Sequence, residues 1–385
     1  MDRSVKEPGE TLEEAFRTEV RAWLAAAPRP EGLRDYGGTP ELTDVAPGRQ
    51  WHRALAEAGY ACLHWPPEHG GRGASVLEQA VFAEEAARAG VPRQLNIVGP
   101  DLAGPVIMRF GTEEQRRAYL PAILRGDHLW CQLFSEPDAG SDLAALRTKA
   151  RRDGGSWVVD GQKVWTSGAE AADHGLLIAR TGQERHQGLT AFVVDMATPG
   201  ITVRPLRQMD GESKFNEVFF DGVRLPEDSL LGELGQGWRV ATATLGQERL
   251  SLGAQAVGMF QALREVTEAA RARDRLDPML EDRITGLWAR IWLLRATWLR
   301  ALAADTELSS SAFSVLKLVS SEVYRDLGDL ATDALGVDAL LGPEESPLVR
   351  RMLVGRAQTI LGGTSEIQRN ILAERVLGLP REPVR

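Results

Sequence analysis

The feature that most constrains this chain is a change in hydrophobic periodicity, from helical to strand-like and back to helical. From about residue 129 to 234, short apolar runs such as GLLIAR, LTAFVVD and NEVFFDGVRL are separated by turn residues. The flanking segments instead repeat apolar residues every three or four positions, as amphipathic helices do. We therefore expect an α+β chain of three domains, with helices over 1–128, an antiparallel β domain over 129–234 and a helical bundle over 235–385.

The local signals within this outline are specific enough to test. In the first third, Phe16, Val20 and Leu24 recur at helical spacing behind a capping box formed by Thr11 and Glu14, and a second box, TEEQ, follows residue 111. In the β domain, SWVVDGQKVW has an Asp-Gly pair between two apolar runs, which predicts a hairpin turn at 160–161. VATATLGQERLSLGAQAVGMFQALREVTEAARAR is expected to form one long helix of the bundle.

Composition excludes several classes of function. A formal net charge of −9 argues against nucleic acid as a partner. Cys62 and Cys131 give neither a disulfide framework nor zinc-ligand spacing, so we expect no metal site and a cytoplasmic location. The polar N-terminus lacks the apolar core of a signal peptide. We also expect no membrane span, because no apolar run approaches the required length.

Two polar motifs in the β domain are candidates for ligand contact. SEPDAGSD, at 135–142, can form a loop whose N–H groups face a phosphate, although a capped surface turn would look the same. KVWTSGA offers an aromatic ring and two hydroxyls that could enclose a flat heterocycle, although Trp165 also suits a core. GELGQGW does not follow a parallel strand in a βαβ unit, so we interpret it as a hinge and not as a dinucleotide loop.

Six segments, taken in order, resemble the acyl-CoA dehydrogenase family, and the resemblance covers nearly the whole chain. They are FGTEEQRRAYLPAILRGD, SEPDAGSD, DGQKVWTSG, FNEVFFDGVRLPEDSLLG, GQERL and LGGTSEIQRNILAERVLG. The resemblance implies an N-terminal helical domain, a central β domain and a C-terminal four-helix bundle. It also implies non-covalent FAD, α,β-dehydrogenation of an acyl-CoA thioester, and an electron-transfer flavoprotein as acceptor.

The resemblance further implies which residues form the site. The expected FAD contacts are Leu133, Ser135, Gly140, Ser141, Trp165, Thr166, Ser167, Thr364 and Glu366. Thr364 and Glu366 touch the FAD of a neighbouring subunit in many family members. Ser141, Arg249, Gly362 and Gly363 are expected on the substrate side, where a backbone N–H of the glycine pair could stabilise an enolate oxygen.

The catalytic base is expected at Glu248. In many family members the base is a Glu immediately before the Gly-Thr of the last motif, a position that Gly362 occupies here. Isovaleryl- and long-chain-type members place it instead on a bundle helix before Arg-Leu, as in GQERL. Independently, Glu248 shares a helical face with Leu245, Leu252 and Met259, and a desolvated carboxylate gains a pKa suited to a base.

Two blander interpretations stay open for the acidic residues. Glu248 could form a surface pair, although the adjacent Arg249 is poorly angled for one. Glu366 is a rival base, but a carboxylate there also suits the positive end of a helix that begins near it.

The resemblance weakens in two segments that contact the adenine side of a neighbour's FAD in family homotetramers. RARDRLDPMLEDR, at 271–283, lacks the usual Phe-Gly and Gln, and DALGVDALLG keeps Gly336 but loses the double glycine. One interpretation is an active homotetramer or dimer for bulky, branched or long acyl groups. The alternatives are a subunit that completes the FAD site of a paralogue in a mixed oligomer, and a flavin oxidase or oxygenase of the same fold in a biosynthetic pathway.

Overall fold

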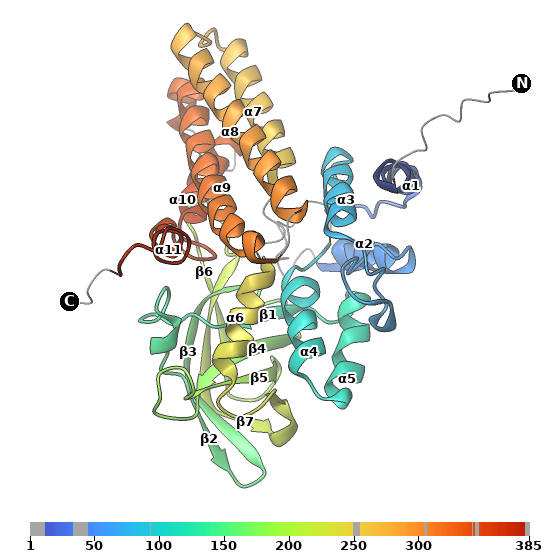
Figure 1. Ribbon diagram of the computed structural model, residues 1–385, viewed down its shortest axis with the longest axis vertical. Coiled ribbons are helices and arrows are strands. Elements are labelled where there is room, and N and C mark those ends of the chain that lie inside the picture. The colour runs from blue at the N-terminus through green and yellow to red at the C-terminus, as the bar shows by residue number, and fades with distance from the viewer. Residues whose placement is uncertain are drawn as a thin grey trace, which may run out of the picture.

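The structure is a computed structural model that describes residues 12–33, 45–92, 94–248, 255–303, 306–340, 342 and 346–381. Its described part has helices at both ends of the chain and a sheet between them, as Figure 1 shows. The expected order of helical, β and helical segments is therefore confirmed.

The N-terminal segment forms helices, and the apolar stripe that the sequence predicts in the first of them is buried. They are α1 (Leu12–Ala26), α2 (Val45–Glu57), α3 (Val76–Arg88), α4 (Gly104–Phe110) and α5 (Glu113–Leu124), with helical turns η2 (Pro67–His69) and η3 (Val98–Ala103). Phe16, Val20 and Leu24 of α1 are all buried, since a spacing of four residues keeps them on one helical face. The predicted capping box begins α5: Gln115 N–H donates to Thr112 Oγ1 at 3.2 Å, and Thr112 N–H donates to Gln115 Oε1 at 3.1 Å. The first predicted box includes Thr11, which lies outside the described residues.

The central segment forms a curled sheet with the strand order β6-β7-β3-β2-β4-β5-β8, and β1 pairs with β4 beside this path. The strands are β1 (Trp130–Leu133), β2 (Lys149–Asp153), β3 (Ser156–Ser167), β4 (His174–Arg180), β5 (Leu189–Asp195), β6 (Ile201–Leu206), β7 (Phe215–Pro226) and β8 (Leu230–Leu231), with helical turns η4 (Leu143–Ala145) and η5 (Glu227–Ser229). The pairings are antiparallel except β1–β4 and β2–β4, which are parallel.

The hairpin expected at Asp160-Gly161 was wrong. Strand β3 continues through both residues, and the pair forms a bulge against β7, with the register shifting between Val159 and Gly161. The turn that joins β2 to β3 is Gly154-Gly155, because Asp153 pairs with Ser156. Gly161 is needed for close packing, since a Cβ there would lie 2.4 Å from Thr148 Oγ1.

The C-terminal segment forms long helices that pack side by side, as in a bundle. They are α6 (Gly237–Glu248), α7 (Gln255–Ala272), α8 (Pro278–Ala303), α9 (Thr306–Leu335), α10 (Pro347–Gln358) and α11 (Ser365–Ile371), with turns η7 (Gly336–Leu340) and η8 (Leu372–Val376). The bundle core contains Met259, Leu263, Ile291 and Trp298. The single long helix expected from residue 240 onward is described as α6 and α7, with residues 249–254 between them outside the described part.

Helix α6 packs against both the sheet and the N-terminal segment. Val240 and Ala241 of α6 belong to a core that also includes Ile178 of the sheet and Trp65 of the N-terminal segment. In Figure 1, α6 runs along the sheet and its C-terminal end points toward the base of the bundle. The end of α6, at the junction of the sheet and the N-terminal helices, therefore points toward the bundle.

Candidate active site

Trp165 is the most unusual residue of the β domain. It sits at a second irregularity of β3, where the register against β7 shifts between Lys163 and Thr166. Its backbone is left-handed, with φ of 60°, and its side chain is 59% exposed beside the edge of Phe215, with ring centroids 6.1 Å apart. A left-handed conformation costs a non-glycine residue about 1–2 kcal/mol. Strain of this kind at an exposed aromatic residue indicates a ligand-binding role.

The two residues after Trp165 carry hydroxyl groups at the C-terminal end of β3. Thr166 is buried, and its Oγ1 has no hydrogen-bond partner among the described residues. Its carbonyl accepts a hydrogen bond from Asn216 Nδ2 at 3.1 Å. Ser167 ends β3 and is half-buried. An unpaired buried hydroxyl costs about 1–3 kcal/mol, so Thr166 is a candidate for a polar group supplied from outside the chain.

The SEPDAGSD loop lies directly beside this strand. It follows the buried Leu133, the last residue of β1, and it turns through two backbone hydrogen bonds of 3.0 Å between Glu136 and Ala139. The carbonyl of Ser135 accepts from Val164 N–H at 2.9 Å, which links the loop to the residue before Trp165. Within the described part of the chain, a Cβ added to Gly140 would meet nothing within 4 Å, so the backbone there is open to a ligand. Ser141 beside it is exposed.

A buried ion pair that sequence reasoning missed lies beneath these two segments. Lys163 is fully buried, and its Nζ donates to Glu136 Oε1 at 2.8 Å and to the carbonyl of Phe134 at 2.9 Å. Burial lowers the pKa of Lys163 to about 8, and the Glu136 carboxylate opposes the shift. Burial alone would raise the pKa of Glu136, but the Lys163 ammonium and two backbone N–H groups hold it below its ordinary value. The sequence signal that could have indicated this pair was a lysine beside Val164 in an apolar strand, together with Glu136 in the SEPDAGSD motif.

The C-terminal motif is a glycine turn followed by a short helix. Gly362 and Gly363 have φ values of 61° and 94°, so both positions favour glycine. Thr364 is the N-cap of α11 and accepts from Ile367 N–H at 3.2 Å. Ser365 Oγ and Gln368 Oε1 are buried without a hydrogen-bond partner in the described structure. This turn therefore also presents unsatisfied polar atoms.

Glu366 has the features of a helix N-terminal charge. Its side chain is 78% exposed and lies 4.0 Å from Arg369. A hydrogen bond from the backbone at the start of the helix lowers the pKa of its carboxyl group. A lowered pKa and high exposure suit dipole stabilisation, whereas a base gains from desolvation.

Glu248 is the last residue of α6, and its backbone lies at the junction described above. Its side chain, that of Leu245, and all of Leu252 and Arg249 lie outside the described part. On the next helix, Met259 and Leu263 of the predicted apolar stripe are buried in the bundle core. The roles of Glu248 and Arg249 stay predictions.

A hydrogen bond and two ion pairs connect the C-terminal end of β3 to the C-terminal helices. Gly168 N–H, after Ser167, donates to the Lys214 carbonyl at 3.0 Å. Lys214 is paired with Glu212 at 2.5 Å, and Glu212 receives Arg350 of α10 at 2.6 Å. Because α10 leads into the glycine turn, this chain of contacts places both candidate motifs on connected elements.

The two segments in which the resemblance weakens lie against each other. Arg273 pairs with Asp338 at 2.8 Å, and Arg275 Nε donates to the Asp333 carbonyl at 2.9 Å. Arg283 also pairs with Asp333. A Cβ on Gly336 would lie 2.6 Å from the Arg275 guanidinium, which therefore covers this glycine.

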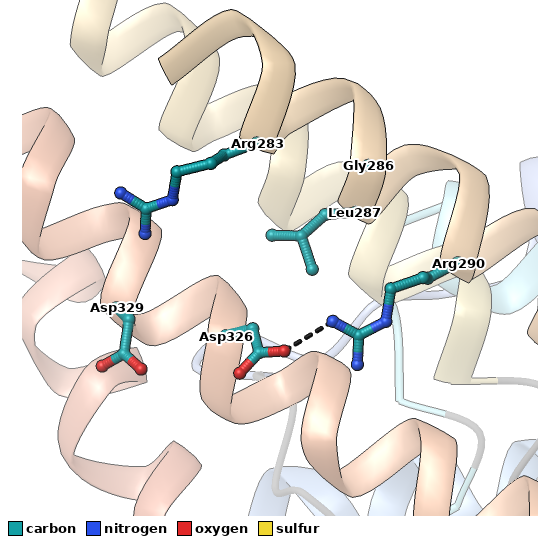
Figure 2. A pocket seen from close by; sticks show the side chains of 6 residues that line it. All are labelled: Arg283, Gly286, Leu287, Arg290, Asp326 and Asp329. Carbon is teal, nitrogen blue, oxygen red and sulfur yellow. Dashed lines mark hydrogen bonds and ion pairs between the residues drawn. The ribbon is translucent and has the colours of Figure 1, made fainter. Parts of the chain in front are cut away.

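A cavity of about 280 Å³ lies between α8 and α9, and Figure 2 shows its lining. Its walls are Arg283, Gly286, Leu287, Arg290, Asp326 and Asp329. Arg290 reaches across it to Asp326 at 2.5 Å. None of its lining residues belongs to the predicted site, although Arg283 also ends the 271–283 segment.

Two searches of the described residues bear on other classes of site. No group of three or more His, Cys, Asp or Glu in the described ranges could hold a metal ion. Among the helices that the structure describes, none is long and apolar enough to cross a membrane. The residues at β3, by contrast, fit a flat heterocycle: an exposed aromatic ring, an unpaired hydroxyl and an open glycine backbone.

The fold, together with the residues at the end of β3 and in the SEPDAGSD loop, is that of an acyl-CoA dehydrogenase type of protein, and comparison with known proteins agrees. The chain matches the N-terminal, middle and C-terminal domains of acyl-CoA dehydrogenases over residues 11–127, 131–223 and 235–377. Acyl-CoA dehydrogenase IpdE1 of Mycobacterium tuberculosis is 43% identical over 378 residues, which cover 96% of this chain and 98% of that protein.

Two solved structures are similar over almost the whole chain. One is titled Tcur3481-Tcur3483 steroid ACAD, with a TM-score of 0.83, 30% identity and coverage of 99% of this chain and 100% of that one. The other is the ChsE4-ChsE5 complex from Mycobacterium tuberculosis, with a TM-score of 0.82, 31% identity and the same coverage. The chain belongs to the acyl-CoA dehydrogenase family and is an oxidoreductase of that type. Members of this family are flavoproteins that bind FAD.

Proposed function

We propose that this protein catalyses the FAD-dependent α,β-dehydrogenation of an acyl-CoA thioester with a bulky, branched or long acyl group. The observation that carries the proposal is the strained, exposed Trp165 beside the unpaired Thr166 hydroxyl, at the edge that also bears the SEPDAGSD loop. These features are arranged to receive a flat, polar-edged ligand and have no evident structural purpose of their own.

The chain's own groups hold the cofactor in this proposal. Trp165 and Ser167 flank the flavin ring, Thr166 adds its hydroxyl, and the main chain from Leu133 to Ser135 contacts the ring from the neighbouring strand. Gly140 and Ser141 offer open backbone and a hydroxyl to a phosphate. When bound, FAD supplies the acceptor for the hydride that leaves the β-carbon of the acyl group.

Glu248 is the proposed base that takes the α-proton of the thioester. Helix α6 supports the proposal because the helix ends at Glu248, and a carboxylate removed from water has the raised proton affinity that a base needs. The left-handed glycine turn at Gly362 supports close approach of backbone to the thioester, where an N–H would stabilise the developing enolate oxygen. Arg249 orders the site, and Thr364 with Glu366 contacts FAD.

The substrate class and the setting are part of the same proposal. In the family that the sequence resembles, a base on a bundle helix accompanies bulky substrates. One structural relative is titled a steroid ACAD. We expect a homotetramer or dimer in the cytoplasm that passes electrons to an electron-transfer flavoprotein.

Replacing the base tests the catalytic assignment. Glu248→Gln should retain bound flavin but fail to bleach it when an acyl-CoA is added without oxygen, because the α-proton has no acceptor. Glu366→Gln tests the rival base and is compared at equal flavin loading, and Glu113→Gln, which changes an exposed carboxylate of α5, is the control that should bleach at the wild-type rate. Normal bleaching by Glu248→Gln would remove Glu248 from the mechanism, and loss of bleaching only in Glu366→Gln would transfer the role.

A second candidate function is favoured by the contacts of the weakened segments. Arg275 covers Gly336, and the Arg273, Arg275 and Arg283 side chains are engaged within the chain. Guanidinium groups committed in this way are less available to a neighbour's adenine. The titles of both structural relatives join two protein names, which supports a subunit that completes a paralogue's FAD site. Purification alone and with a co-expressed paralogue separates the two functions: a wild-type chain that holds FAD only with its partner favours the second.

A further inference from the structure

A fully buried lysine joins the two segments of the β domain that are proposed to face FAD. Lys163 lies on β3, two residues before Trp165, and its Nζ donates to the Phe134 carbonyl at 2.9 Å. Phe134 immediately precedes Ser135, whose own carbonyl accepts from Val164 N–H at 2.9 Å. Two hydrogen bonds from adjacent residues of β3 therefore hold adjacent carbonyls at the start of the loop.

The partner of Lys163 closes the same loop from its other end. Glu136 Oε1 accepts from Lys163 Nζ at 2.8 Å and from Thr148 N–H at 2.9 Å, and Oε2 accepts from Arg147 N–H at 2.6 Å. The carboxylate thus ties the beginning of the loop to residues 147 and 148. Gly140 and Ser141, the open part of the loop, lie between these two anchored ends.

Stability alone is a weak reason to bury such a pair. Desolvation of two charges largely offsets their attraction, and apolar residues of similar volume stabilise a fold as well or better. A charged pair instead fixes directions, since each donor and acceptor must meet a specific partner. We propose that Lys163, acting with Glu136, is a positioning residue that sets the loop 135–142 against Trp165 so that both can contact FAD. This inference rests on the proposed function.

Three variants separate positioning from simple stability. Lys163→Met removes the donor but leaves Glu136 buried and unpaired, so it is expected to destabilise the fold. Lys163→Met/Glu136→Gln removes both charges at nearly constant volume and is expected to recover the thermal midpoint, while the Phe134 carbonyl still lacks its donor. Arg224→Met/Asp153→Asn is the control, because that pair of 2.7 Å is exposed in the same domain.

Two readouts are taken on each folded variant. Hydrogen exchange of the flavin-free protein reports on peptides covering 133–148, and fluorescence of free FAD gives its dissociation constant. In the Lys163→Met/Glu136→Gln variant we expect roughly tenfold faster exchange in these peptides. We also expect the dissociation constant of FAD to rise at least roughly tenfold, because a charge-assisted hydrogen bond is lost. The control should match wild type in both.

The outcomes distinguish this inference from the proposed function. Wild-type exchange and wild-type FAD affinity in the double variant would overturn the positioning role, as would a matching change in the control. A wild-type protein that binds no FAD would overturn the proposed function, and the exchange comparison would still decide whether Lys163 holds the loop. Recovery of FAD binding together with the thermal midpoint would assign the pair to stability alone and overturn the inference.

Discussion

At the scale of single residues, the site is marked by groups that the fold does not need. The exposed Trp165 has a backbone that glycine would adopt without strain, and Thr166 buries a hydroxyl without a partner in the described residues. Both features cost free energy in the isolated chain, and under the proposed function bound FAD would offset that free energy. The residues of the site are therefore expected to trade stability for binding.

Replacing Trp165 by glycine tests this trade directly. Relief of the left-handed strain and the added chain entropy of glycine nearly cancel, so the free energy of unfolding of the flavin-free protein should change by less than about 1 kcal/mol. FAD affinity should fall at least about tenfold, because the aromatic wall is lost. Urea unfolding and flavin fluorescence measure the two quantities. A large loss of stability with unchanged FAD affinity would make Trp165 a structural residue.

Residue identities in the motifs were predictable from sequence, whereas their environments were not. SEPDAGSD and KVWTSGA both point to a ligand, yet sequence spacing does not reveal that a lysine of one reaches a glutamate of the other. That contact depends on how β1 and β3 are brought together, which is a property of the tertiary fold. For the same reason, Glu366 could be separated from a base only once its exposure and helix position were known.

At the scale of elements, helix α2 carries a buried titratable group. His52 is almost fully buried, and Leu95 N–H donates to its Nδ1 at 3.4 Å. Burial lowers the pKa of His52 to about 4, against the favourable charges of Asp101 and Asp127, while Arg49 adds to the lowering. The folded protein therefore keeps this imidazole neutral at pH values where the unfolded chain takes up a proton.

Acid should weaken the protein through this histidine. Between about pH 6.5 and pH 4 the unfolded state binds one more proton at this position, so the free energy of unfolding should fall as the pH drops, by about 3 kcal/mol at most. His52→Gln should reduce that slope while keeping an acceptor for Leu95 N–H. Urea unfolding at a series of pH values measures it, with the exposed His186→Gln as control. An unchanged slope in His52→Gln would show that other groups cause the acid sensitivity.

The elements that sequence misassigned were those decided by long-range pairing. Asp160-Gly161 has a strong local preference for a turn, but pairing of β3 with β7 along most of both strands outweighs that preference. The capping box of α5 was predictable because all its contacts lie within four residues. Sequence signals whose contacts are local therefore predicted the structure correctly, whereas a turn signal that competes with strand pairing did not.

At the scale of the whole molecule, a buried charge cluster joins the N-terminal helices to the bundle. Glu84 of α3 is paired with Arg295 of α8 at 2.8 Å and with Arg17 of α1 at 3.3 Å. Arg17 also meets Glu85 at 2.5 Å. These contacts join α1 and α8 to α3, and so link the N-terminal helices to the bundle.

Removing the centre of this cluster should weaken the link between these helices. Glu84→Gln leaves Arg295 and Arg17 without this carboxylate, although Arg17 keeps Glu85, and it should lower the free energy of unfolding by about 3 kcal/mol. Glu113→Gln, which disturbs an exposed pair with Arg117, should lower it by less than about 1 kcal/mol. Chemical denaturation compares the two variants. Equal effects would show that the cluster contributes no more than an exposed pair.

The order of helical, β and helical segments was predictable because each has its own hydrophobic period. Assembly was not predictable, because neither charge nor periodicity identifies the surface that a second chain would cover. Trp288 and Trp292 of α8 are exposed and lie edge to face, with ring centroids 5.9 Å apart. The hydrophobic periodicity of the helix does not predict the role of this aromatic surface. The exact limits of the three domains, at 128/129 and 234/235, stay predictions.

The most direct test of the account is anaerobic titration of the purified, FAD-loaded protein with a panel of acyl-CoA thioesters, followed by the visible absorbance of the bound flavin. The account predicts that the absorbance of oxidised flavin is lost on addition of a bulky, branched or long acyl-CoA, and that short straight chains act poorly. Flavin that stays oxidised with every member of the panel would contradict the proposed dehydrogenation.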